Sequence, residues 1–208
     1  MPSNRSGVEP EDLDWVGLGN AVQAGVWQVP ARQAVTRAGF PADTPATTVN
    51  EASGSGLRAI TLAADRIAAG RADIAVGGGM ESMSSAPHVV EMREGRRYGD
   101  ATLEDTMIRD GLWDTVYDAH MGELTEHLVD REEISREAQD RYALESNRRA
   151  ARAVESGDFD EEVVAVEQEG DALARDEGPR PDTDMETLGA LSPAFEEGGT
   201  ITAGNASG

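Results

Sequence analysis

The chain has 208 residues, enough for one large domain or two small ones. It carries 40 acidic residues against 18 basic ones, which gives a formal net charge of -22. This charge argues against nucleic acid and anionic membranes as partners, because both require a basic face that neutralises phosphate.

Strands and helices are expected to alternate in the first part of the chain. The apolar pattern predicts a short strand at residues 16–20, a helix at 30–38 and a strand at 47–50. A long helix is expected at residues 57–69 and a compact buried strand at 74–79. This alternation predicts an α/β fold with a parallel sheet.

The apolar periodicity weakens after the last of these strands. Prolines and glycines predict excursion loops over the sheet at residues 80–122. Ser135 is expected to cap a long helix at residues 136–155, which Gly157 ends. A short strand at residues 163–166 and a further loop region follow.

Two residue types are missing from the chain. It contains no lysine, and an acidic surface without lysine is typical of proteins that stay soluble in concentrated salt, so we expect a salt-adapted organism such as a halophilic archaeon. It contains no cysteine, which excludes a disulfide, a thiolate metal site and a cysteine nucleophile within it. No apolar run approaches about 20 residues and no signal peptide is recognisable, so we expect a cytoplasmic protein.

Residues 49–59 form the most informative segment, because an expected strand leads through a glycine-rich turn into a helix. Ser53 stands in that turn, where free N–H groups and the positive end of the helix dipole would stabilise negative charge. A nucleophile suits this position. A serine before a helix is also a common N-cap, which requires no catalysis, and the residues alone leave both interpretations open.

The same segment resembles the active site of thiolases, which have an acyl-accepting cysteine where this chain has Ser53. Further segments resemble the family in its order and at its spacing. They are residues 20–25, 28–33, 77–84, 117–122, 178–183, 191–195 and 202–208. The resemblance covers essentially the whole chain.

The resemblance implies a thiolase-like fold, of which this chain is an incomplete N-terminal half with an excursion loop region. Residues 1–83 and 196–208 are expected to form a partial thiolase N-terminal α/β domain. Residues 84–195 are expected to form the loop region for coenzyme A binding and oligomer contacts. The first strand and helix of the fold and the C-terminal thiolase domain are expected to be absent.

The activity that the resemblance implies is acyl transfer between acyl-CoA and CoA or acetyl-CoA through an acyl-enzyme, in fatty acid metabolism. In the family the missing half supplies the histidine that activates the nucleophile. A serine hydroxyl needs such a base during its attack, whereas a cysteine can exist as a thiolate. Two hypotheses follow: a serine variant that still transfers acyl groups, or a catalytically inactive subunit that binds CoA and oligomerises.

Coenzyme A is expected as a substrate, without a tightly bound cofactor. Residues that match the family's contacts with CoA are Leu112, His120, Met121, Arg180, Thr187, Leu191, Ala203, Gly204 and Ser207. The leucines suit an apolar wall and Arg180 suits adenine or phosphate. Taken singly, such leucines more often belong to a core and such an arginine more often to a solvated surface.

Metal binding is not expected, because His88 and His127 lack the partners and spacing of a metal site. Residues 91–98 form the only locally basic patch. The resemblance brings this loop near tetramer contacts and the CoA entrance. A role in assembly or in steering acidic CoA and a plain solvated loop are both open for these residues. The family resemblance implies a homo-oligomer, a dimer or tetramer, for the full-length form, or a partner that carries the missing half.

Overall fold

A computed structural model describes residues 6–168 and 171–207. The chain divides into two compact units between Trp113 and Asp114. The expected domain limits at residues 83/84 and 195/196 stay a prediction, and residues 1–5, 169–170 and 208 of those domains lie outside the described residues.

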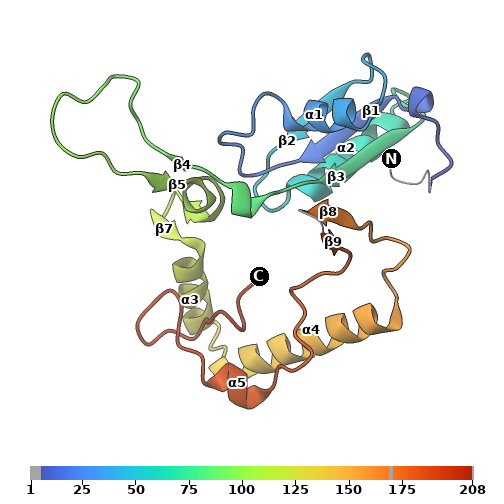
Figure 1. The fold of residues 1–208 in the computed structure, drawn as a ribbon. Coiled ribbons are helices and arrows are strands. Elements are labelled where there is room, and N and C mark those ends of the chain that lie inside the picture. The colour runs from blue at the N-terminus through green and yellow to red at the C-terminus, as the bar shows by residue number, and fades with distance from the viewer. Residues whose placement is uncertain (1–5, 169–170, 208) are drawn as a thin grey trace. The chain divides into compact units, whose positions relative to one another are not determined.

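A three-stranded parallel sheet, with strand order β2-β1-β3, forms the centre of the first unit (Figure 1). In chain order its elements are β1 (Trp15–Gly19), α1 (Pro30–Arg37), β2 (Ala46–Val49), α2 (Ser55–Ala68) and β3 (Ala75–Gly79). The predicted α/β fold with a parallel sheet is thus confirmed. Each of these elements begins and ends within two residues of its predicted bounds.

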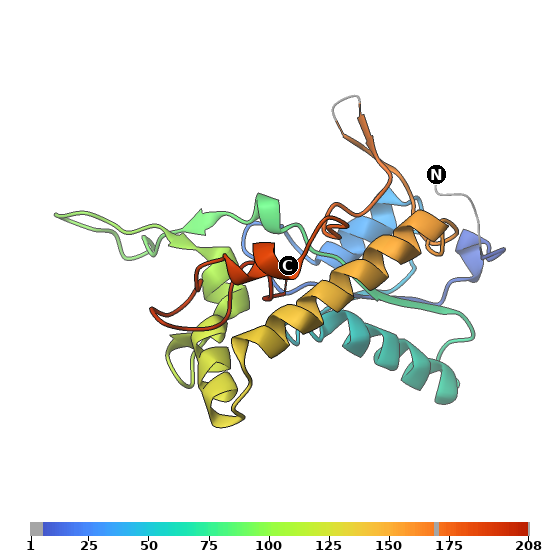
Figure 2. The same cartoon turned by 90° about the horizontal axis from the view of Figure 1, so that it is seen from below.

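The two helices cover opposite faces of the sheet (Figures 1 and 2). On the α1 face, Leu13, Val16 and Val35 form a buried apolar cluster. Side chains alternate along a strand, so the neighbouring Trp15 faces α2. Its ring is almost fully buried and lies 4.6 Å from the guanidinium carbon of Arg66, a cation–π contact.

After β3 the chain leaves the sheet through a series of short elements. These are a 3₁₀ turn (Met83–Ser85), β4 (His88–Val89), β5 (Glu104–Asp105), a π-helical segment (Met107–Leu112) and β6 (Trp113–Asp114). β4 and β5 pair in antiparallel fashion. Thr106, fully buried, donates its hydroxyl to the carbonyl oxygen of Pro87 at 2.6 Å and anchors the start of the π-helical segment.

The second unit is mainly helical. Its elements are β7 (Ala119–His120), α3 (Met121–Arg131), α4 (Arg136–Ser156), β8 (Val166–Gln168), β9 (Asp171–Leu173) and α5 (Met185–Gly189). As predicted, Ser135 caps α4 by accepting the N–H of Ala138, and Gly157 ends the helix with a φ of 76°.

The strand predicted at residues 163–166 was wrong in position, because β8 begins only at Val166. Pairing with β9 sets its limits, with Val166 opposite Leu173. The short helix α5 was not predicted. Its Leu188 is buried against Ala143 and Leu144 of α4, so tertiary packing stabilises a helix too short to form alone. Among the described helices, none has both the length and the apolar character to cross a membrane.

Candidate active site

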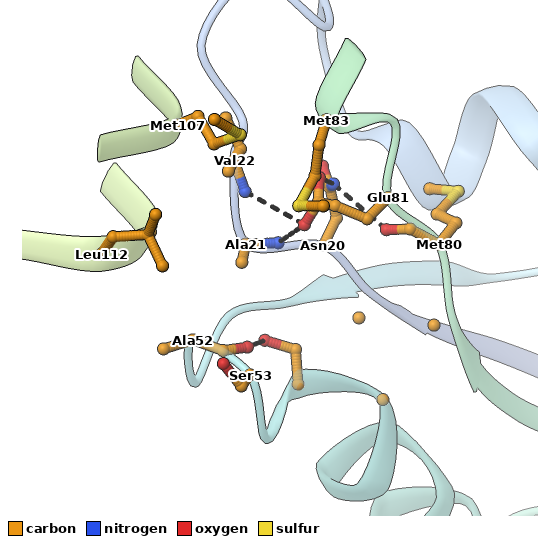
Figure 3. Close-up of a pocket in the computed structure, with 15 residues that line it drawn as sticks. Asn20, Ala21, Val22, Ala52, Ser53, Met80, Glu81, Met83, Met107 and Leu112 are labelled. Atoms are coloured by element: carbon orange, nitrogen blue, oxygen red, sulfur yellow. Dashed lines mark hydrogen bonds between the residues drawn. The ribbon is translucent and has the colours of Figure 1, made fainter. Parts of the chain in front are cut away.

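A pocket of about 410 Å³ lies in the first unit, where the strands end and α2 begins (Figure 3). In open α/β sheets, ligands bind beyond the carboxyl ends of the strands. The residues that line this pocket are Gly19, Asn20, Ala21, Val22, Ala52, Ser53, Ser55, Gly56, Gly79, Met80, Glu81, Met83, Met107, Gly111 and Leu112.

Glycines in the strands allow α2 to approach the sheet closely. A Cβ on Gly19 would lie 2.4 Å from the carbonyl carbon of Ser55, and a Cβ on Gly77 would lie 2.6 Å from the Cα of Ile60. Neither distance is possible for real atoms, so any side chain at these positions would push the helix away. The glycines therefore hold the start of α2 beside the end of β1.

Ser53 precedes α2 by two residues and its side chain is exposed in the pocket. Within the described part of the chain, its hydroxyl forms no hydrogen bond. The N-cap of α2 is Gly54, which offers no side-chain cap, so the alternative interpretation of Ser53 as the N-cap was wrong. The preceding residue, Ala52, has a φ of 49°, a left-handed conformation that alanine rarely adopts.

Hydrogen bonds from Ser55 and Asn50 fix this turn. The Ser55 hydroxyl donates to the carbonyl oxygen of Ala52 at 2.6 Å and accepts the N–H of Glu51 at 2.9 Å. The N–H of Ala52 donates to Oδ1 of Asn50 at 3.0 Å. The turn thus has a defined shape rather than that of a loose loop.

The N–H groups beside Ser53 are less free than the sequence suggested. That of Gly54 donates to the carbonyl oxygen of Glu51 at 3.0 Å, and that of Ser55 donates to the carbonyl oxygen of Ala52 at 3.2 Å. The expectation of free donors was therefore wrong for these two groups. The N–H of Ser53 itself has no acceptor among the described residues.

Glu81 connects the two strand ends on the other side of the pocket. Its Oε1 accepts Nδ2 of Asn20 at 2.6 Å, and its Oε2 accepts the N–H groups of Ala21 at 2.8 Å and Val22 at 3.2 Å (Figure 3). Sequence reasoning assigned no role to Glu81 or Asn50. The signal that could have identified them was their position, Asn50 at the end of one expected strand and Glu81 two residues after another.

Apolar side chains complete the pocket. They come from Met80 and Met83 after β3 and from Met107 and Leu112 of the π-helical segment (Figure 3). Leu112 belongs to the set predicted to contact CoA, and it shares the pocket with Ser53.

The predicted residues His120 and Met121 lie at the start of α3 in the second unit. His120 is the N-cap of that helix: its Nδ1 accepts the N–H of Gly122 at 3.0 Å, so a proton on the neutral ring must be carried by Nε2. Its ring stacks on Phe195 with 5.0 Å between the ring centroids. Met121 is exposed.

The predicted residues Arg180, Thr187 and Leu191 lie in or near α5. Arg180 is exposed, and its N–H donates to Oδ1 of Asn147 at 3.0 Å. The N–H of Thr187 donates to Oδ1 of Asp184 at 2.7 Å, and this bond, together with one donated by the Thr187 hydroxyl, lowers the pKa of Asp184. Leu191 is half-buried against the apolar cluster of the second unit.

The last three predicted residues, Ala203, Gly204 and Ser207, follow the buried Thr202. The N–H of Gly204 donates to the Thr202 hydroxyl at 3.2 Å. A Cβ on Gly204 would lie 2.6 Å from the side chain of Leu191, so these two members of the predicted set are neighbours. Ala203 and Ser207 are exposed.

Residues 4–208 match the family model of the thiolase N-terminal domain. The chain belongs to the thiolase family. The acetyl-CoA acetyltransferases of Thiocystis violacea and Cupriavidus necator are 47% and 48% identical to it over 210 residues, and each match covers 98% of this chain and 53% of the relative. This thiolase chain therefore spans about half the length of these curated relatives.

A solved structure supports the same assignment. The acetyl-CoA acetyltransferase of Bacillus anthracis superposes with a TM-score of 0.93 and 40% identity, over 98% of this chain and 53% of that one. The thiolase-like fold that the sequence motifs implied is thus confirmed.

Proposed function

We propose that this chain carries the nucleophile of a thiolase-type acyltransferase, with Ser53 as the acyl acceptor and CoA thioesters as substrates. One observation carries the proposal: the Ser53 hydroxyl, without a hydrogen bond in the described part of the chain, is exposed in a pocket at the start of α2. The names of the relatives, acetyl-CoA acetyltransferase, support this chemistry.

In the proposed reaction, Oγ of Ser53 attacks the thioester carbonyl carbon and its proton passes to a base. The N–H of Ser53 and the positive end of α2 stabilise the negative charge that develops on the carbonyl oxygen. The C–S bond then breaks, and CoA leaves with a proton. CoA or the enolate of a second acetyl-CoA attacks the resulting ester and releases the serine, which completes a double displacement.

The base is proposed to be a histidine from the part of a thiolase that this chain does not match. Glu81 is the only titratable side chain among the described residues that line the pocket, and both its oxygens already accept hydrogen bonds. This observation also favours the second candidate function, a catalytically inactive thiolase subunit that binds CoA and oligomerises.

CoA recognition is proposed for the residues that match the family's contacts with CoA. Leu112 offers an apolar wall beside Ser53. Arg180 offers an exposed guanidinium for phosphate or adenine. The other proposed contacts are His120, Met121, Thr187, Leu191, Ala203, Gly204 and Ser207.

The wider setting is proposed from the composition and the family. The absence of lysine and the charge of -22 support a salt-adapted, cytoplasmic enzyme, and fatty acid metabolism is its proposed context. We propose a homo-oligomer, a dimer or tetramer, as the working form. We also propose a partner that carries the remaining half. We propose no nucleic acid or membrane partner and no tightly bound cofactor.

Mass spectrometry after incubation with acetyl-CoA in high salt tests the proposal. The chain is incubated alone and with a supplied thiolase C-terminal half, and we expect an acetyl group on Ser53 when both halves are present. Ser53→Ala should abolish the adduct, whereas Ser84→Ala, which changes an exposed serine, should not. A folded, CoA-binding assembly without the adduct would establish the inactive subunit instead.

A further inference from the structure

A continuous series of hydrogen bonds leads from Glu81, after β3, to the turn that carries Ser53. The Glu81 carboxylate accepts the N–H of Val22 at 3.2 Å. The carbonyl oxygen of the same peptide unit, that of Ala21, accepts Nδ2 of Asn50 at 3.1 Å. Oδ1 of Asn50 in turn accepts the N–H of Ala52 at 3.0 Å. The ends of all three strands are joined in this way.

Every donor in the series points toward the carboxylate. The peptide unit and the Asn50 amide are thus aligned head to tail, so that each bond polarises the next. Asn50 uses both ends of its amide, one as donor and one as acceptor. Aspartate at this position would keep only the acceptor, and alanine would keep neither.

The series ends at the strained residue of the turn. Ala52 has a φ of 49°, a conformation that costs free energy for alanine and persists only where the surroundings hold it. Asn50 binds its N–H, and Ser55 binds its carbonyl oxygen at 2.6 Å. Both polar groups of Ala52 are therefore fixed, and its conformation sets the direction in which Ser53 follows.

We propose that Asn50 and Glu81 are positioning residues that hold Ala52 in its left-handed conformation and so aim Ser53 into the pocket. The effect of these residues on acyl transfer rests on the proposed function, whereas their effect on the conformation of Ala52 does not. Both side chains are exposed and lie outside the buried apolar cluster, so replacing them removes no apolar packing.

Acetylation kinetics of Ser53, with both halves present, give the first test. Asn50→Ala and Glu81→Gln should lower the rate constant at saturating acetyl-CoA at least about tenfold, because the nucleophile is misaligned, and leave the half-saturating concentration unchanged. Asn50→Asp should lower this rate constant less than Asn50→Ala, because aspartate keeps the acceptor for the N–H of Ala52. Glu51→Gln is the control, since the Glu51 carboxylate pairs with Arg58 instead. Equal rates for Asn50→Ala and the wild type would overturn the proposal.

Nuclear magnetic resonance of the same variants gives a test that needs no acyl transfer. A left-handed Ala52 has a short distance between its own amide and α protons, and hence a strong cross-peak between them. Asn50→Ala should weaken this cross-peak and speed amide exchange of Ala52 about tenfold. If the wild type accepts no acetyl group, the proposed function fails while this measurement still decides the inference. An unchanged cross-peak in Asn50→Ala would refute it.

Discussion

The two units hold their helices in place by different kinds of contact. In the first unit, α2 meets the sheet through main-chain atoms at Gly19 and Gly77, with no side chain between them. In the second unit, buried carboxylates join the helices to the segments around them. The main-chain contact of the first unit is disrupted by any side chain added at the glycines. The contacts of the second unit are disrupted when a carboxylate oxygen is removed.

Two buried acids make the contacts of the second unit. Glu126 of α3 accepts the N–H groups of Thr200 at 2.9 Å and Ile201 at 2.8 Å. Asp140 of α4 accepts Nε of Arg136 at 2.8 Å and Nδ2 of Asn205 at 2.9 Å. These bonds hold the stretch that contains the proposed CoA contacts Ala203 and Gly204.

The largest effect is expected from Gly77→Val in the first unit. Its Cβ would meet the backbone of Ile60 and Ala59, which cannot move without shifting α2, so the free energy of unfolding should fall by at least about 3 kcal/mol. Urea denaturation followed by tryptophan fluorescence measures it, because all three tryptophans belong to this unit.

Gly78→Ala is the matched control for this contact. Its Cβ would lie 3.8 Å from Leu18, an ordinary contact, so stability should hardly change. If both variants lose the same stability, close approach of the helix is not what makes glycine necessary here.

Asp140→Ala is expected to have the next largest effect. It removes the carboxylate that accepts hydrogen bonds from the partly buried Arg136 guanidinium and from the Asn205 amide, and leaves both only carbonyl acceptors. This should cost about 2–3 kcal/mol. Far-UV circular dichroism reports the loss of α4, and Glu137→Gln, on the exposed side of the same helix, is the control. If the unfolding midpoint followed by tryptophan fluorescence falls by the same amount as the midpoint followed by circular dichroism, the two units unfold together. The distinction between their contacts would then fail.

Glu126→Gln should have the smallest effect, about 1–2 kcal/mol at neutral pH, with a distinct pH dependence. Burial alone would raise the pKa of Glu126, but hydrogen bonds from Ile201 and Thr200 outweigh it and lower this pKa. The carboxylate therefore stabilises the fold fully above its unfolded pKa and loses this contribution as pH falls through its lowered folded pKa. Denaturant titrations at decreasing acidic pH should show that the free energy of unfolding falls more steeply for the wild type than for Glu126→Gln. Parallel pH dependences would contradict this.

The fold of the first unit could be predicted because local signals agree with one another there. Pro30 opens α1, Gly70 follows α2, and apolar runs mark the strands. In the second unit β8 was misplaced, since a hairpin is defined by its partner strand. The roles of Glu126 and Asp140 were not visible either, because an acid on an amphipathic helix has the pattern of a solvated residue.

For the candidate site, the sequence pointed to Ser53 through its turn and to Leu112 through the family resemblance. It could not reveal the left-handed Ala52, since the conformation depends on bonds from Asn50 and Ser55. Nor could it reveal that Glu81 binds the segment after β1, because 60 residues separate Glu81 from Ala21 in the chain.

The close contact of α2 with the strand glycines also determines which wall of the pocket moves when a larger ligand binds. The wall that carries Ser53 is stiff, because main chain rests on main chain at Gly19. The opposite wall is compliant, because Met80, Met83 and Met107 can each change rotamer at little cost. A bulkier acyl group will therefore displace the methionines and leave Ser53 in place. One side of the pocket thus adapts to the size of the substrate, and the other side keeps the nucleophile aligned.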